Sequence, residues 1–142
     1  IEPDFWIGQW QLGQAYERMG RTNEALEVLA HASRLSNGNS KLVSLTVYLL
    51  ARTGRANEAR EILDTLECRA RDVYVPPVAV AMGHLGLNDK AQVFEWLEQA
   101  LAVRDVHLIY VPWDAKWEAL RGEQRFRDFL RRSELGAERV RG

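Results

Sequence analysis

Apolar residues in the first part of the chain recur with the spacing of a helix face. Leu12 and Tyr16 lie four residues apart, and Ala25 and Leu29 repeat the interval. Such i, i+4 spacing places the side chains on one side of an α-helix. Gly20 lies between the two pairs, and a glycine at that place ends the first helix. The pattern therefore predicts two helices joined by a tight turn, which pack against each other as a hairpin.

The same pattern returns along the chain with a fixed period. Residues 20–29 recur as residues 54–63, thirty-four positions later, with seven of the ten residues identical. One further period on, the glycine is replaced by Asn88, which also tolerates a left-handed turn. A fixed period of this length is typical of a solenoid, in which each unit buries its apolar face only against the next unit. The expected units cover about residues 6–39, 40–73 and 74–107.

Local signals mark the predicted helices. Thr22 or Asn23 can cap the second helix of the first unit, since their side-chain oxygens accept hydrogen bonds from free backbone N–H groups. Ala25, and Ala59 one period later, are small enough to let the two helices of a hairpin approach closely. Pro77 suits the first turn of a helix in the third unit, where a missing N–H group does little harm.

The period and its residues resemble the tetratricopeptide repeat over residues 6 to about 103. The residues that carry this resemblance are Gly13, Tyr16, Gly20, Ala25 and Ala32. It implies an all-α fold, a right-handed superhelix of about three helix hairpins followed by C-terminal capping helices. The third unit departs from the family pattern at His84 and Val93, so we expect wider or rotated packing there.

Residues 108–135 resemble the closing segment of tetratricopeptide modules at the C-termini of bacterial signalling proteins. Asp114 matches the usual Asp-Pro-x-Phe core, whereas Ala115 and Trp117 replace its Pro and Phe. Two apolar stripes support a capping role, because each can cover the last hairpin. The stripes are Trp113, Trp117 and Leu120, and Phe126, Phe129 and Leu130. We expect residues 136–142 to form a flexible tail.

The resemblance also indicates where a partner binds. In tetratricopeptide arrays the first helix of each hairpin lines a concave face, and such a groove takes an extended or helical peptide. The first helices here supply aromatic, thioether and basic side chains, which suit apolar and charge-assisted contacts. Packing of Trp10 and Tyr48 against neighbouring helices is the alternative. The expected groove residues are Trp10, Gln14, Glu17, Arg18, Lys41, Ser44, Tyr48, Arg52, Val75, Val78 and Met82.

The residues at the matching positions argue against one known ligand class. Tetratricopeptide cochaperones hold the acidic C-terminal tails of heat-shock chaperones with a clamp of Lys, Asn and Arg side chains. The corresponding positions here are Trp10, Gln14, Leu45, Val75 and Ala79. None of them retains a clamp residue, so we expect no chaperone carboxylate clamp.

Composition and charge exclude several further classes. The formal net charge of −1 argues against the broad basic field that nucleic-acid binding requires, and acidic residues alternate with the C-terminal arginines. No apolar run approaches the ~20 residues of a membrane helix, and no secretion signal is evident. We therefore expect a soluble cytoplasmic protein. The sequence begins at Ile1 rather than Met, which suggests a fragment of a longer protein or a processed form.

The sequence carries no constellation for catalysis or for a cofactor. It has no glycine-rich phosphate loop, zinc-type His/Cys cluster or nucleophile elbow. We expect the single cysteine, Cys68, to be half-buried and His84 to be a hydrogen-bonded core histidine. His107 follows Asp105 by two residues, and an orienting pair is conceivable, but no nucleophile accompanies it. We predict a chain without enzymatic activity, metal or cofactor.

These observations predict a protein-interaction or scaffold module that binds a peptide or helix in the concave groove. Two alternatives stay open. The closing segment's resemblance implies a regulatory C-terminal module of a bacterial cyclase, kinase or transcription regulator. Open solenoid ends and exposed tryptophans allow homo-oligomerisation as the second alternative.

Overall fold

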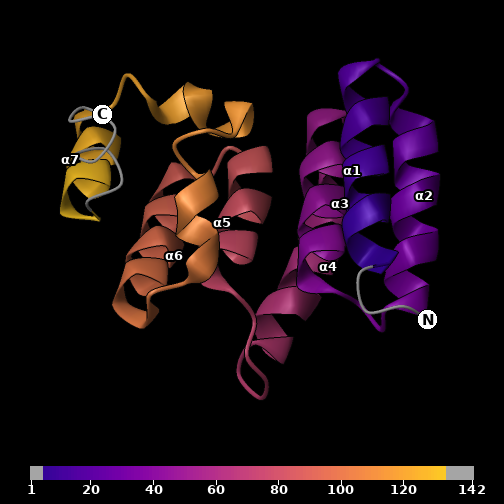
Figure 1. The fold of residues 1–142 in the computed structure, drawn as a ribbon, viewed down its shortest axis with the longest axis horizontal. Helices are drawn as coiled ribbons and strands as arrows, with labels where there is room; N and C mark the ends of the chain where they lie inside the picture. The colour runs from indigo at the N-terminus through magenta and orange to yellow at the C-terminus, as the bar shows by residue number, and fades with distance from the viewer. Residues whose placement is uncertain (1–4, 134–142) are drawn as a thin grey trace.

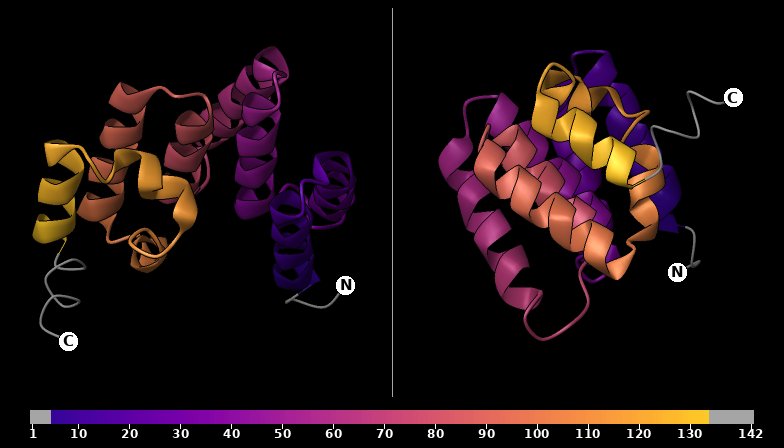
Figure 2. Two further views of the ribbon diagram at one scale, coloured as in Figure 1. Left: turned by 90° about the horizontal axis from the view of Figure 1, so that it is seen from above. Right: turned by 90° about the vertical axis from the view of Figure 1, so that its left-hand side faces the viewer.

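The computed structural model describes residues 5–133, and every regular element in this range is a helix (Figure 1). The elements are α1 (Phe5–Arg18), α2 (Thr22–Leu35), α3 (Ser40–Arg52), α4 (Ala56–Arg69), α5 (Pro77–Gly86), α6 (Lys90–Val103), the short 3-10 helices η1 (Val106–Tyr110) and η2 (Ala115–Leu120), and α7 (Gln124–Arg132). The helix hairpins succeed one another along the molecule, with α1 and α2 at one end and α7 at the other (Figures 1 and 2). The predicted all-α solenoid is confirmed.

Each hairpin turns at a residue in the left-handed region of backbone conformation. Gly20, Gly54 and Asn88, spaced by the period of the repeat, have φ values of 76°, 83° and 59°. This conformation costs little for glycine and is tolerated by asparagine, whereas a residue with a larger side chain is strained there. The prediction that Asn88 takes the place of the repeated glycine is confirmed.

The second helices of the first two hairpins begin with the same ion pair. Arg55 donates to Glu58 through Nε and Nη2, both at 2.9 Å, and Arg21 makes the equivalent contacts with Glu24. The repeat therefore reproduces a local interaction as well as a packing pattern. The predicted capping by Thr22 or Asn23 is wrong, because α2 already begins at Thr22 and the N-cap position holds an arginine, which makes no side-chain cap.

Small residues bring the helices close together. Ala25 and Ala59 are fully buried, as their spacing predicted. A Cβ atom added to Gly86 would lie 2.7 Å from the Cα atom of Tyr48. Because close-packed atoms do not approach a backbone carbon so closely, α5 can lie against α3 at this distance only with glycine at position 86.

The helices of the third hairpin bury many of their side chains. Every residue of α5 is buried, including Pro77, which stands in the first turn as predicted. Val93 of α6 is fully buried. His84 is buried as well, and the expected wider or rotated packing of this hairpin stays a prediction.

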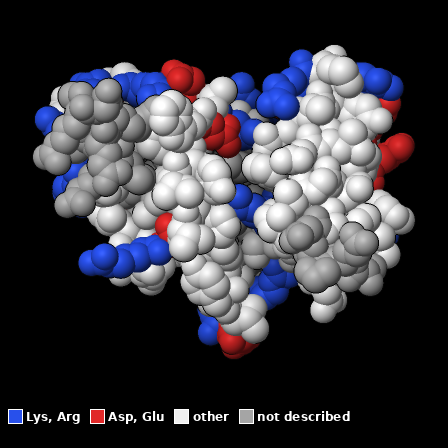
Figure 3. Space-filling view, in the orientation of Figure 1, with Lys and Arg blue, Asp and Glu red and all other residues white. Residues whose placement is uncertain are grey.

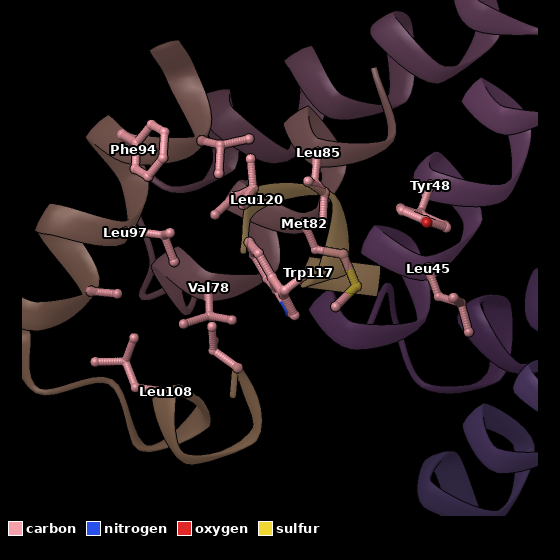
Figure 4. Close-up of a cluster of buried hydrophobic side chains, with 14 of the residues drawn as sticks. Leu45, Tyr48, Val78, Met82, Leu85, Phe94, Leu97, Leu108, Trp117 and Leu120 are labelled. Atoms are coloured by element: carbon pink, nitrogen blue, oxygen red, sulfur yellow. The ribbon is translucent and has the colours of Figure 1, made fainter. Parts of the chain in front are cut away.

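The segment after α6 completes the hydrophobic core. Trp117, Phe126 and Phe129 are at most 1% exposed and share one cluster with side chains of α3, α5 and α6. Figure 4 shows the Trp117 ring beside Val78 and Met82 of α5. The apolar side chains of α7 therefore pack on the core, as a capping role requires. Trp117 of η2 packs in addition against α5, the first helix of the third hairpin.

Trp113 departs from its predicted stripe. It is 70% exposed, whereas Trp117 and Leu120 are buried. The 3-10 helix η2 begins only at Ala115, so the four-residue spacing of an α-helix does not apply to Trp113. Leu130 is partly buried against the core as expected. The expected tail, residues 136–142, lies outside the described residues.

Candidate binding groove

The groove of the first helices is partly filled by the chain itself. Residues 106–120, which we call the C-terminal segment, lie against α3 and α5. Val78 and Met82, which we predicted to line the groove, are only 6% and 9% exposed beside Trp117. The predicted residues Ser44, Tyr48 and Val75 are buried as well. The expectation that these side chains are accessible is therefore wrong. Trp117 of the C-terminal segment covers Val78 and Met82, whereas Val75 is buried in a separate cluster with residues of α4. Tyr48 packs against neighbouring helices, which is the alternative given above.

The other predicted groove residues remain accessible. Trp10, Gln14, Glu17 and Lys41 are partly exposed, and Arg18 and Arg52 are exposed. Most of them border a pocket of about 340 Å³, which lies in the range of ligand pockets, roughly 300–1,000 Å³. We call it the polar pocket. Its lining residues are Trp10, Gln14, Glu17, Arg18, Tyr48, Tyr110, Asp114, Ala115 and Lys116.

A smaller, mostly apolar pocket adjoins the polar pocket. Its volume is about 40 Å³, and it shares Trp10, Tyr110 and Asp114 with its larger neighbour. We call it the apolar pocket. Its further lining residues are Lys41, Ser44, Pro76, Val78, Ala79, Met82, His107, Val111 and Trp117.

The ammonium group of Lys41 lies between two aromatic rings. Its Nζ atom is 4.6 Å from the ring centre of Trp10 and 4.8 Å from that of Tyr110, and such contacts stabilise a cation. Burial lowers the pKa of Lys41, and the charges of Asp105 and Asp114 oppose this effect. Within residues 5–133, no carboxylate oxygen lies within 4.0 Å of Nζ.

Two cations flank Tyr48 at the base of the polar pocket. Arg52 lies 5.8 Å and Lys116 5.7 Å from its ring centre. Lys116 also forms an ion pair with Asp114 at 3.6 Å within the C-terminal segment, and its contact with Tyr48 joins the segment to α3. Burial raises the pKa of Tyr48 against the opposing charge of Arg52, so its hydroxyl stays protonated at neutral pH.

A buried carboxylate fastens the C-terminal segment to the start of α5. Asp105 Oδ2 accepts the Val78 N–H at 3.0 Å, and Oδ1 accepts the backbone N–H of His107 at 2.9 Å and contacts its Nδ1 at 2.8 Å. Burial opposes ionisation of Asp105, but the hydrogen bonds from His107 and Val78 outweigh it and lower its pKa. The pair of Asp105 and His107 that the sequence suggested is thus formed.

The Ser44 hydroxyl also lines the apolar pocket. It donates to the backbone carbonyl of Lys41 at 3.2 Å and makes no hydrogen bond with His107.

A family model described as tetratricopeptide repeat matches residues 2–109, which is most of the chain. The chain belongs to the tetratricopeptide repeat family. Comparison with curated proteins and with solved structures gave no match. Tetratricopeptide repeats generally mediate protein–protein interactions, and the fold is not a catalytic one. The match ends within η1, so η2 and α7 follow the tetratricopeptide repeats as additional elements.

Four residues of the polar pocket were not predicted for it, Ala115 and three residues with polar side chains. Tyr110, Asp114 and Lys116 come from the C-terminal segment, beyond the matched tetratricopeptide repeats. The sequence signal for these turns is the pair of aspartates, Asp105 and Asp114. In the structure each of them accepts the N–H of the second residue after it. This arrangement is typical of tight turns, and aspartates spaced in this way indicate successive turns rather than one long helix.

Other notable residues of the tetratricopeptide hairpins have structural positions. His84 is buried, and its Nε2 contacts Glu67 Oε1, as predicted for a hydrogen-bonded core histidine. Cys68 is exposed rather than half-buried, because Leu63 and Leu66 are the residues that α4 turns toward the core. No group of three His, Cys, Asp or Glu residues in the described chain could hold a metal ion. None of the described helices is long and apolar enough to cross a membrane.

Arginines of α7 have acidic or aromatic neighbours. Arg132 pairs with Glu98 of α6, and Arg125 lies 4.5 Å from the ring centre of Phe94. Figure 3 shows basic and acidic side chains interspersed on the visible face. This distribution differs from the clustered basic patch that is typical of nucleic-acid-binding surfaces.

Proposed function

We propose that this tetratricopeptide domain is a protein-interaction module that binds a peptide or short helix at the polar pocket. The observation that carries the proposal is the composition of that pocket. It combines the aromatic faces of Trp10 and Tyr110 with the charged groups of Glu17, Arg18 and Lys116. Aromatic and arginine side chains contribute most of the binding energy at protein interfaces, and charges beside them select the partner.

The burial pattern supports the α1 side of the groove as the binding surface. Val78 and Met82 already pack against the chain's own Trp117, so a peptide that reaches them has to displace a buried tryptophan. Gln14 and Arg18 on α1 are partly exposed and exposed, respectively. A partner can bind there without disturbing the core.

Peptide selection tests this proposal. A displayed library of random linear peptides is panned on the full chain, and synthetic versions of the enriched peptides are titrated by calorimetry. We expect the double change Gln14→Ala and Arg18→Ala to weaken binding at least about tenfold, because it removes a hydrogen-bonding and a charged contact. The matched control changes Glu27 and Arg60, which are exposed on α2 and α4, to alanine. Equal affinity for both variants would place the binding surface elsewhere.

Exposed apolar residues favour self-association as a second candidate function. Val106 and Ile109 on η1 are 72% and 54% exposed, and Tyr110 beside them is 55% exposed. Exposed apolar groups that lie together are typical of interaction sites. Sedimentation equilibrium of the chain and of the Val106→Ser, Ile109→Ser double variant tests this candidate. If the chain dimerises through η1, the dimer fraction should fall in the variant.

A regulatory role in a bacterial signalling protein stays a prediction from the resemblance.

A further inference from the structure

The unpaired charge of Lys41 is the feature that points to a particular ligand chemistry. In the described chain, its ammonium group contacts the rings of Trp10 and Tyr110 and forms no hydrogen bond or ion pair. The ammonium group is half-buried and carries three N–H donors, which the aromatic rings do not accept as ordinary hydrogen bonds. Its Nζ atom still reaches water, so within the described chain solvent is the acceptor left for these donors. An anion above the rings completes the coordination.

The starts of two helices lie at the apolar pocket. Lys41 lies in the first turn of α3, and Pro76, Val78 and Ala79 bring the start of α5 to the same pocket. Both helix ends are already capped, α3 by the Asn39 side chain and α5 by Asp105, so the charge available to a ligand is that of Lys41. The one acidic side chain that lines the apolar pocket, Asp114, is already paired with Lys116 at 3.6 Å.

The size of the apolar pocket limits what can accompany the anion. A volume of about 40 Å³ holds roughly three water-sized groups, at about 10–15 Å³ for each. The branched tip of a leucine, isoleucine or valine side chain has this number of carbon atoms, whereas an aromatic ring is larger. Val78, Ala79 and Met82 form apolar walls for such a tip.

We propose that the partner segment carries an aspartate or glutamate next to a branched aliphatic residue, with the carboxylate paired to Lys41 and the aliphatic tip in the apolar pocket. This inference rests on the proposed function and adds the chemistry of the peptide. The rest of the peptide lies along the polar pocket, against Gln14 and Arg18. The recognition uses an internal acidic side chain and needs no free C-terminus.

The enriched peptides from the display library test this inference directly, because their C-termini are fused to the display protein. We expect a branched aliphatic residue adjacent to Asp or Glu in the enriched sequences. Synthetic peptides with blocked ends are then compared with versions in which Glu becomes Gln, or the aliphatic residue becomes Ala or Trp. Each change should weaken binding about tenfold or more. Gln lacks the charge of Glu, Ala leaves the apolar pocket empty, and Trp is too large for it.

A double-mutant cycle assigns the carboxylate to Lys41. The variant Lys41→Met keeps the apolar stem and removes the charge, and its melting curve checks the fold. It should lose about tenfold in affinity for the Glu peptide and little for the Gln peptide. If both peptides lose equally, or if the variant binds both as the original chain does, the inference is overturned. Peptides that respond to the Gln14 and Arg18 changes but not to Lys41→Met would overturn this inference while leaving the proposed function in place. A library without any enriched peptide would overturn both.

Discussion

The first helices of the first and third repeats occupy equivalent places in the solenoid but differ sharply in burial. In α1 only Gly13 is buried, whereas every residue from Pro77 to Gly86 in α5 is buried. The helix α1 is covered by α2 and α3 on one side. The helix α5 lies against α3, α4 and α6 and is covered in addition by the C-terminal segment, through Trp117. The same repeat position is thus a surface at one end and a core element at the other.

This difference shows how the segment beyond the repeats divides the groove. It completes the core over α5 and leaves the α1 side accessible, where the polar pocket lies. The predictions that follow test whether stability and binding are divided in the same way.

Removing the cover should have the largest effect. Deletion of residues 113–132 takes away Trp117, Phe126 and Phe129, which are almost fully buried. The apolar faces of α5 and α6 would then meet water, and we expect aggregation or loss of cooperative unfolding. Light scattering and urea denaturation followed by circular dichroism measure this. A truncated chain that stays monomeric and unfolds at the same urea concentration would show that α5 and α6 are stable without residues 113–132.

Single tryptophan changes on the two sides should differ. Trp117→Ala removes a ring that is 1% exposed, and we expect a loss of about 3–5 kcal/mol in the free energy of unfolding. Trp10 is partly exposed, so Trp10→Ala should cost roughly half of that or less. Urea denaturation with tryptophan fluorescence gives both values. Equal losses would contradict the division between a core side and a surface side.

The same glycine change should have opposite signs on the two helices. Gly86→Ala places a Cβ atom 2.7 Å from the Cα atom of Tyr48, so we expect a loss of about 1–3 kcal/mol. Gly8 has no atom within 4 Å of an added Cβ, and Gly8→Ala should stabilise α1 by about 0.5–1 kcal/mol. Thermal melting of the two variants under one set of conditions decides this. A destabilised Gly8→Ala variant would mean that α1 is packed more closely than its exposure indicates.

Acid should weaken the attachment of the C-terminal segment. The pKa of Asp105 is lowered in the folded chain, so its contribution to stability is present above the ordinary carboxyl pKa of about 3.9 and is lost as the pH falls through the lower, folded value. Asp105→Asn should cost about 1–2 kcal/mol at neutral pH, because the hydrogen bonds to Val78 and His107 lose their charged acceptor. The difference in the free energy of unfolding between the original chain and the variant should become smaller below about pH 4. A difference that stays constant from pH 7 to pH 3 would argue against this role of the carboxylate.

The repeated part of the fold could be predicted from the sequence because its determinants are local. The turn residues Gly20, Gly54 and Asn88 and the small residues Ala25 and Ala59 act within one hairpin, and each lies where the period placed it. The cap of α2 was missed because an arginine at that position makes an ion pair with Glu24 instead of a side-chain cap.

The path of the C-terminal segment could not be predicted in the same way. It consists of 3-10 turns without the helical period, and it is positioned by contacts between residues far apart in the sequence, such as Asp105 with Val78. For this reason the pairing of α1 with Tyr110 and Lys116 in one pocket was not foreseen, and the accessibility of Tyr48 was overestimated. Trp10 and Lys41, which were both predicted for the groove, are in contact with each other.

Hydrogen exchange measured by mass spectrometry tests the division of the solenoid most directly. In the full chain, amides of α5 should exchange only through global unfolding, whereas amides of α1 should exchange much faster through local opening. In the Trp117→Ala variant, protection should fall strongly in α5 and little in α1. Equal protection of the two helices in the full chain, or an α5 whose exchange does not respond to loss of Trp117, would contradict the conclusion that the C-terminal segment makes one half of the groove a core and leaves the other half as the binding surface.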